Sequence, residues 1–318
     1  MVKNKSRPVP CSVIIGSLLA FSTHLVYANP LSNFFDSYRQ ARDNGKTSHR
    51  IGIDNDTLLL NRNDGFYTSG ISYTQAHTLQ QGSEAGVYGW HIGQELYTAS
   101  DIKLPPAQVG TLDHPYAGWL FGGAFKEMHR EDGTHYRVGV DIGCLGPCAG
   151  GRWTQTNFHR VIDQPLPQGW SRQVKNEIGV VLQGEIAPVS WRAGDSFDLT
   201  PSLRGRFGNI FTDLGAGFTA RAGRLNILPN QPALYGFLRA NVTAVGYNAM
   251  LQGGYFSDNN PHTVDPKRVV GEAEIGLAWT GGPYGARIGL VRRGNEIRNL
   301  PDSAGSQNYV HMQFSYTP

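Results

Sequence analysis

The segment VVGEAEIGLAW runs from Val269 to Trp279, and after the turn residues Gly281-Gly282-Pro283 the segment YGARIGLV runs from Tyr284 to Val291. Both segments show a period-two alternation of side chains. Such alternation places successive residues on opposite faces of a β-sheet. The residues between them are typical of turns. We therefore expect two strands here, joined by a turn.

The same alternation recurs along most of the chain. Together with a strand near Arg50–Asn55, the segments number about a dozen, and turn-like clusters such as Asn61–Gly65 separate them. The other segments are Tyr67–Tyr73, Val87–Leu96, Tyr116–Met128, Tyr136–Ile142, Ile178–Ile186, Phe197–Phe207, Phe211–Ala222, Leu234–Ala244, Tyr247–Tyr255 and Tyr309–Tyr316. This pattern predicts an all-β protein.

The N-terminus has the organisation of a secretory signal. A basic start with Lys3, Lys5 and Arg7 precedes an apolar stretch, and Ala28 is a plausible cleavage point, so we expect residues 1–28 to be removed. The apolar stretch is too short for a membrane-spanning helix. Removal leaves 25 of the 28 basic residues against 25 acidic ones. This balance gives no indication of a nucleic-acid partner.

In an exported protein, about ten-residue alternating strands joined by turns fit an outer-membrane β-barrel, whose closed sheet leaves no unpaired edge in the lipid. Aromatic residues near the strand ends favour this interpretation, since a barrel carries them at both membrane interfaces. They are Tyr67, Tyr97, Tyr116, Trp119, Trp279, Tyr284, Tyr309 and Tyr316. A soluble exported β-sandwich or barrel would show the same alternation.

No long polar or low-complexity linker divides the chain. We expect an N-terminal segment over residues 29–48, with a short amphipathic helix over Pro30–Asn44, and a single barrel domain over residues 49–318. Of the three cysteines, Cys11 leaves with the signal, and Cys144 and Cys148 remain four residues apart. Export favours a disulfide between them over a metal pair, and two free thiols stay an alternative.

Several polar residues at strand ends carry possible chemistry. Asn55 and Asp56 offer amide and carboxylate oxygens, which are ligands for a hard cation such as calcium, although the pair is also ordinary turn chemistry. Thr68 and Ser69 bring two hydroxyls into a strand, where such residues are usually structural. No Gly-x-Ser-x-Gly motif surrounds Ser69, so little supports a serine hydrolase.

A Gly-rich segment from Gly143 to Gly151 leads to Gln155, Asn157 and His159. If this stretch is extended, the two amides and the imidazole share one face. An imidazole can take a proton and return it near neutral pH, so His159 is the candidate general base. A lone histidine is more often a surface or structural residue.

Five motifs in order along the chain resemble the outer-membrane lipid A 3′-O-deacylase family. They are Asn55-Asp56, Tyr67-Thr68-Ser69-Gly70, Gln94-Glu95-Leu96-Tyr97-Thr98, Pro115-Tyr116-Ala117-Gly118-Trp119, and Gly146-Pro147 through Gln155 to His159. Pro167-Gln168-Gly169-Trp170, Gln173 and Glu177 are also similar to many members. The match spans Ile51–Glu177, and the C-terminal half agrees only as barrel strands. Cys144, Cys148 and His114 depart from the family pattern.

The resemblance implies a 12-stranded antiparallel transmembrane barrel that hydrolyses the esters of the 3′ acyl chains of lipid A in the outer leaflet, with calcium required. Position by position, it assigns catalysis to His159, Gln155 and Thr68, calcium binding to Asn55 and Asp56, and substrate binding to Lys103. It leaves either water or Thr68 as the nucleophile. Arg152 and Arg160 are further candidates for binding the phosphorylated headgroup.

We expect a monomeric outer-membrane enzyme. Two alternatives stay open: a non-catalytic barrel that is a pore or a structural protein, and a calcium-dependent phospholipase on the same scaffold.

Overall fold

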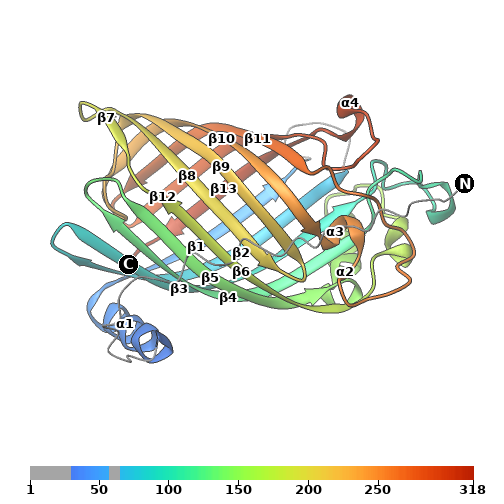
Figure 1. The fold of residues 1–318 in the computed structure, drawn as a ribbon, viewed down its shortest axis with the longest axis horizontal. Coiled ribbons are helices and arrows are strands. Elements are labelled where there is room, and N and C mark those ends of the chain that lie inside the picture. Colours follow the sequence, from blue (N-terminus) through green and yellow to red (C-terminus); the bar gives the residue numbers. More distant parts are fainter. Residues whose placement is uncertain (1–29, 57–64) are drawn as a thin grey trace, which may run out of the picture. The chain divides into compact units, whose positions relative to one another are not determined.

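The protein folds into one antiparallel sheet that closes on itself (Figure 1). The computed structural model describes residues 30–56 and 65–318. Pairing of the first strand with the last, and of β6 with β8, completes the ring. Within the described ranges, twelve strands form the barrel: β1 (Lys46–Asn55), β2 (Phe66–Gln81), β3 (Glu84–Thr98), β4 (Ala117–Arg130), β5 (His135–Leu145), β6 (Glu177–Ala187), β8 (Phe197–Gly208), β9 (Phe211–Arg224), β10 (Ala233–Asn248), β11 (Val269–Gly281), β12 (Tyr284–Arg293) and β13 (Gln307–Tyr316).

The remaining elements lie before the barrel strands or in the connections between them. The short strand β7 (Trp191–Ala193) pairs with the start of β8 and extends one hairpin beyond the ring. The helices are α1 (Pro30–Asn44), α2 (Gly151–Val161), α3 (Ala249–Gln252) and α4 (Asp302–Gly305), with 3₁₀ turns η2 (Pro106–Gln108), η3 (Pro147–Ala149) and η4 (Gly169–Arg172). Among the described residues, no helix is long and apolar enough to cross a membrane.

The closed barrel confirms the predicted fold, with one error in the strand assignment. The segment Tyr247–Tyr255 is not a strand: β10 ends at Asn248 and the chain turns into α3. The Asn248 side chain accepts a hydrogen bond from the Met250 backbone N–H at 3.0 Å and so caps the helix. Met250 and Leu251 are both fully buried, which explains why the segment has the apolar content of a strand.

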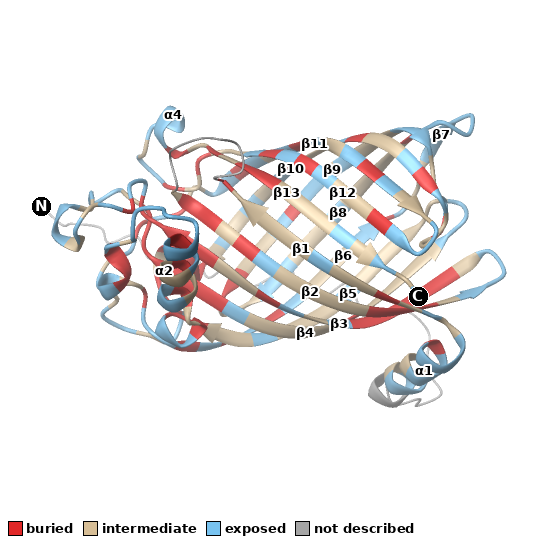
Figure 2. Cartoon of the chain, turned by 180° about the vertical axis from the view of Figure 1, so that it is seen from behind, coloured by how far each residue is buried: buried red, intermediate tan, exposed pale blue. Residues whose placement is uncertain are grey.

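Side chains alternate between a polar interior and an apolar exterior. On β11, Ile275 and Leu277 are exposed on the outside, whereas Glu274, which precedes Ile275, is buried in the lumen, where it pairs with Arg287 at 3.0 Å. The same alternation runs along β12, where Ile288 and Leu290 are exposed. Figure 2 shows this alternation of exposed and buried residues along the strands. An apolar outer surface around a charged interior is the organisation of an outer-membrane barrel.

The two ends of the barrel differ. Short turns such as residues 82–83, 131–134 and 282–283 join the strands at one end. The connections at the other end include the long segments 99–116, 146–176 and 249–268 and carry α2, α3 and α4 (Figure 1). Short turns face the periplasm and long loops face the outside in such barrels. A buried cluster lies inside the long-loop end and includes Tyr67, Tyr97, Trp119, Leu145, Phe211, Met250, Val291 and Tyr309.

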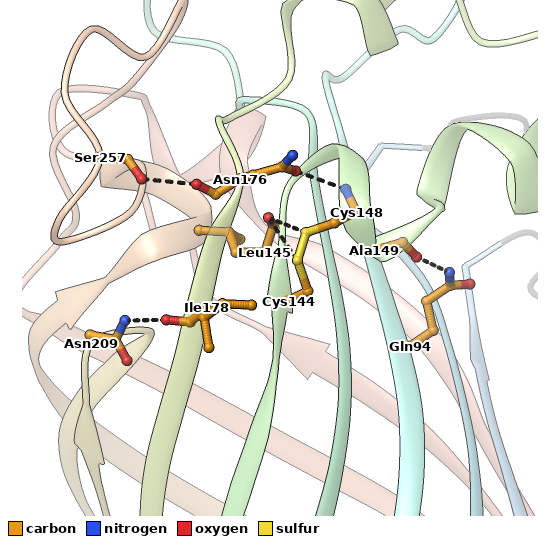
Figure 3. The surroundings of a disulfide bond; sticks show 9 residues. All are labelled: Gln94, Cys144, Leu145, Cys148, Ala149, Asn176, Ile178, Asn209 and Ser257. Atoms are coloured by element: carbon orange, nitrogen blue, oxygen red, sulfur yellow. Dashed lines mark hydrogen bonds between the residues drawn. A yellow bond between two sulfur atoms is a disulfide. The ribbon is translucent and has the colours of Figure 1, made fainter.

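A disulfide joins Cys144, near the end of β5, to Cys148 in η3 (Figure 3). Their Cα atoms lie 5.9 Å apart, within the ordinary range for such a bond, so the predicted pairing is confirmed. The backbone N–H of Cys148 donates to Asn176 Oδ1 at 2.8 Å, which attaches this loop to the start of β6. The predicted signal segment, residues 1–28, lies outside the described residues.

Candidate active site

The helix α2 carries the two central candidates, Gln155 and His159. The extended conformation considered for this segment does not occur: residues 151–161 are helical, and four-residue spacing puts Gln155 and His159 on one face. Both are buried, together with Gly151. Asn157 does not share this face, because a spacing of two residues from Gln155 puts it about 200° away around the helix. Its side chain donates to the Trp153 carbonyl at 2.8 Å. The helix therefore brings together one amide and one imidazole.

Glycines start this helix and let it approach the barrel. Gly150 precedes the helix at φ 72°, a left-handed conformation that glycine adopts readily. At Gly151, a Cβ atom would lie 2.6 Å from Trp170 Cη2 and 2.8 Å from Leu96 Cδ2, closer than packing allows. Gln94 on β3 also donates to the Ala149 carbonyl at 2.6 Å (Figure 3). The start of α2 is thus packed directly on the end of β3.

His159 is held by a backbone carbonyl. Its Nδ1 lies 2.7 Å from the carbonyl oxygen of Pro165, and the side chain is 6% exposed. A carbonyl oxygen only accepts hydrogen bonds, so Nδ1 must carry the proton. In the neutral imidazole the lone pair is then on Nε2. This tautomer makes Nε2 the basic nitrogen.

Gln155 is oriented by an indole. Trp170 Nε1 donates to Gln155 Oε1 at 2.7 Å, and both side chains are buried. Because an indole can only donate, the amide oxygen must face Trp170, and the amide nitrogen faces away from it. Gln155 Nε2 is buried and has no hydrogen-bond partner among the described residues. A buried amide N–H without an acceptor is costly unless a ligand completes it.

The predicted residues Asn55, Asp56 and Thr68 lie at the same end of the barrel. Asn55 ends β1 and pairs with Ser69, and Asp56 is buried with its Oδ2 accepting from the Gly65 backbone N–H at 3.1 Å. Thr68 is the extra residue of a β-bulge between Tyr67 and Ser69. Bulges re-aim side chains and are common beside active sites.

The strand register connects these residues to α2. Ser69 on β2 is the partner of Asn55 on one side and of Leu96 on the other, and Leu96 is the residue on which Gly151 packs. The Thr68 hydroxyl is hydrogen-bonded to the hydroxyl of Thr98, the last residue of β3, at 2.6 Å. The ends of β1 and β3, the start of β2, and α2 therefore form one rim of the barrel.

Comparisons with known proteins show the family of this barrel. The family model "Outer membrane protein LpxR" matches residues 15–317. The chain belongs to the LpxR family. A solved structure of LpxR from Salmonella typhimurium is similar over 85% of this chain and 99% of that chain, with a TM-score of 0.73 and 22% sequence identity. The β-domain of the Bordetella autotransporter BrkA covers 86% of this chain and 98% of its own at TM-score 0.47 and 10% identity. No curated protein matches.

In this LpxR-family barrel, Lys103 lies in the long connection between β3 and β4 and is exposed. The connection is attached to the loop that follows α2: the Gln168 backbone N–H donates to the Ile102 carbonyl at 2.8 Å. Arg172 also donates to the Pro106 carbonyl at 2.9 Å. The loop that carries Lys103 and the loop that follows His159 are thus joined by hydrogen bonds, while a role for Lys103 in binding stays a prediction.

Oxygen donors suited to calcium occur at this rim. Asn55 and Asp56 supply an amide oxygen and a buried carboxylate, which is the ligand chemistry that calcium prefers. Glu177, at the start of β6, has another function: its carboxylate accepts from Asn209, Ser257 and the backbone N–H groups of Tyr255 and Phe256. It anchors the loop after α3, and this saturation makes it a structural residue.

Elsewhere in the LpxR-family barrel, one group within the described ranges has the composition of a metal site. The ligand atoms of Glu127, His129 and His135 lie within 4.8 Å of one another, near the short turn between β4 and β5. Arg137 donates to the Glu127 carboxylate, so a cation already neutralises the only acid. Two imidazoles are poor calcium ligands. We assign no metal to this group.

Sequence reasoning missed the groups that orient the candidates. The Pro165 carbonyl fixes the tautomer of His159, but a backbone oxygen has no sequence signal. Trp170 lies in a family-like motif, but only the structure reveals that its indole N–H donates to Gln155 on α2 and so orients the amide.

Proposed function

We propose that this LpxR-family protein is a calcium-dependent lipid A 3′-O-deacylase, with His159 as the general base. The observation that carries the proposal is the pair on the buried face of α2. His159 has its basic nitrogen set by Pro165, and Gln155 has a buried amide N–H that lacks an acceptor. Base and donor are the two groups that ester hydrolysis requires.

In the proposed reaction, His159 Nε2 takes a proton from a water molecule, and the water oxygen bonds to the ester carbonyl carbon. The carbonyl oxygen gains negative charge, and Gln155 Nε2–H donates a hydrogen bond to it. Collapse of this intermediate breaks the bond to the sugar oxygen, which receives the proton from His159. The products are a fatty acid and a free 3′ hydroxyl.

Water is the nucleophile in this proposal, and Thr68 binds the substrate. The Thr68 side chain is 3% exposed and its hydroxyl is engaged with Thr98, which favours a positioning role over acylation. Asn55 and Asp56 would hold calcium. When bound, the ion supplies positive charge that stabilises the developing oxyanion. Lys103, Arg152 and Arg160, all exposed, are proposed to pair with the phosphates of the headgroup.

The test is mass spectrometry of lipid A from Gram-negative cells that express the wild type, His159→Ala or Asn157→Ala, with calcium present or chelated. Asn157 is the matched control, because it lies on α2 outside the buried face. Loss of the 3′ acyl chains should require His159 and calcium, and the Asn157 variant should retain it.

Unchanged lipid A in every sample, with folded protein in the outer membrane, would reject the deacylase. Release of fatty acid from phospholipids instead would identify a phospholipase, and no release from either lipid would identify a non-catalytic barrel.

A further inference from the structure

The exposed side of α2 is unusually apolar for a helix at the outer end of a barrel. Trp153 is 73% exposed, Phe158 52% and Val161 83%. The apolar character continues into the loop, where Ile162 and Leu166 are also exposed. Exposed aromatic and aliphatic side chains so close together mark an interaction surface rather than a solvated helix face.

Two of the apolar side chains of α2, Phe158 and Val161, occupy one flank of the helix. At 100° per residue, Gly151, Gln155 and His159 define the buried face. Arg152 and Arg160 are exposed and follow on one side of that face. Phe158 and Val161 lie on the other side, and Trp153 lies opposite the buried face, beside Arg160. The helix therefore has a buried catalytic face, a cationic flank and an apolar flank.

The strands joined by the α2 connection have an apolar outer surface. The connection that contains α2 joins β5 to β6, and the outward residues of these two strands are exposed and apolar: Val138, Ile142, Ile178, Val180 and Leu182. Their side chains form part of the apolar belt that an outer-membrane barrel presents to the hydrocarbon. Only the five residues 146–150 separate Leu145, the end of β5, from Gly151, the start of α2.

We infer that α2 is an interfacial helix that rests in the outer leaflet, with Phe158 and Val161 among the acyl chains, Arg152 and Arg160 at the anionic headgroups, and Trp153 at the boundary between the two. Basic residues on one flank, apolar residues on the other and a tryptophan at their boundary are the features of helices that lie in a membrane interface. The partner is thus a lipid surface. This inference does not depend on the proposed ester chemistry.

Trp153 provides a direct probe. The full-length protein is reconstituted in vesicles whose lipids carry bromine, a contact quencher of tryptophan, either near the headgroup end or near the methyl end of the acyl chain. Subtracting the emission of Trp153→Phe from that of the wild type isolates Trp153. Trp279→Phe, treated in the same way, reports an exposed tryptophan on the wall of β11.

We expect bromine near the headgroup end to reduce the Trp153 signal by about two-fold or more, and bromine near the methyl end to have a smaller effect, since interfacial helices lie at the headgroup boundary. Quenching of Trp153 by iodide in the water, with no effect of either brominated lipid, would overturn the inference. The Trp279 signal shows that the barrel is inserted.

A second variant connects the surface to catalysis. In Phe158→Asn/Val161→Asn, we expect a roughly ten-fold loss of kcat/KM on lipid in vesicles, because membrane binding scales with buried apolar area. Hydrolysis of a soluble short-chain ester should not change. Equal activity of this variant and the wild type on vesicles would count against the inference. If no ester is cleaved by either protein, the proposed function fails and the quenching result still decides the lipid contact.

Discussion

At the scale of single residues, Trp170 determines which way the amide of Gln155 faces. An amide has a donor end and an acceptor end, and a partner that can only donate selects one orientation. The same logic applies to His159, where a carbonyl selects the tautomer. Both catalytic candidates thus depend on neighbours that contribute no chemistry of their own, and their effects can be separated by mutation.

Replacing Trp170 by Phe keeps most of the buried ring but removes the hydrogen bond to Gln155. We expect kcat to fall by about 100-fold with little change in KM, as for a misplaced catalytic group. Replacing Gln155 by Glu removes the donor itself and should cost about 100- to 1,000-fold in kcat. Steady-state kinetics on lipid A in detergent would measure both. Wild-type kcat in Gln155→Glu would exclude an oxyanion role.

His114 is buried in the long connection between β3 and β4, where it stacks on Tyr97 with ring centres 5.4 Å apart. Burial lowers the pKa of His114 below its ordinary value of 6.5. The unfolded chain therefore binds this proton more tightly than the folded one. The stability contribution is present above pH 6.5 and is lost as the pH falls towards the folded-state pKa.

We therefore expect the free energy of unfolding in urea to decrease between about pH 7.5 and about pH 5, and His114→Phe to weaken this dependence. The variant keeps a ring against Tyr97 but cannot titrate. It also loses the hydrogen bond from Nδ1 to the Pro115 carbonyl, so its stability at the higher pH should be lower. An identical pH dependence in both proteins would show that His114 is not responsible.

At the scale of elements, α2 depends on the absence of a side chain at Gly151. We expect Gly151→Val to displace the helix from Leu96 and Trp170, and to lower kcat/KM by about 100-fold while the barrel still folds. Gly184→Ala on β6 is the matched control, because its nearest neighbour would lie 3.8 Å from the new Cβ. Heat-modified migration in gels would verify folding. Full activity of Gly151→Val would show that the close packing of α2 on Leu96 and Trp170 is not required for catalysis.

Strands and helices differed in how far the sequence predicted them. The strands could be predicted from the sequence because one face of the sheet contacts lipid and the other faces the charged lumen. This difference makes apolar and polar residues alternate with a period of two. The residues of α2, GRWTQTNFHRV, show no such regularity, since the helix divides its surface among the barrel, the solvent and an exposed apolar flank. The sequence therefore did not reveal the helix there. The family motifs still identified Gln155 and His159, but they did not show that the two residues share one face of a helix.

At the scale of the whole molecule, the lumen is stabilised by charge pairs that cross between strands. Glu274 on β11 lies within 3.1 Å of Arg239 on β10 and 3.0 Å of Arg287 on β12, and its side chain is 2% exposed. The Glu274 carboxylate therefore forms ion pairs with two guanidinium groups at the same time. Sequence alternation predicted which residues face inward, but the pairing depends on the register of three strands.

We expect Glu274→Gln to destabilise the barrel by about 3 kcal/mol, because it leaves buried cations without compensation. Glu84→Gln is the control: its pair with Arg130 is about half exposed, and its loss should cost under about 1 kcal/mol. Urea unfolding in lipid vesicles would give both values. Equal effects of the two substitutions would show that water in the lumen screens the Glu274 network.

The pairing of β1 with β13 means that the ring of strands has no intrinsic first member. His49 lies opposite Tyr316 at the short-turn end, so a brief peptide can connect the last strand to the first without disturbing any pair. A circularly permuted gene that begins at another short turn encodes the same ring. Circular permutation thus changes the order in which the strands are synthesised while the folded barrel and its site stay the same. Comparing permuted proteins would show whether membrane insertion depends on that order.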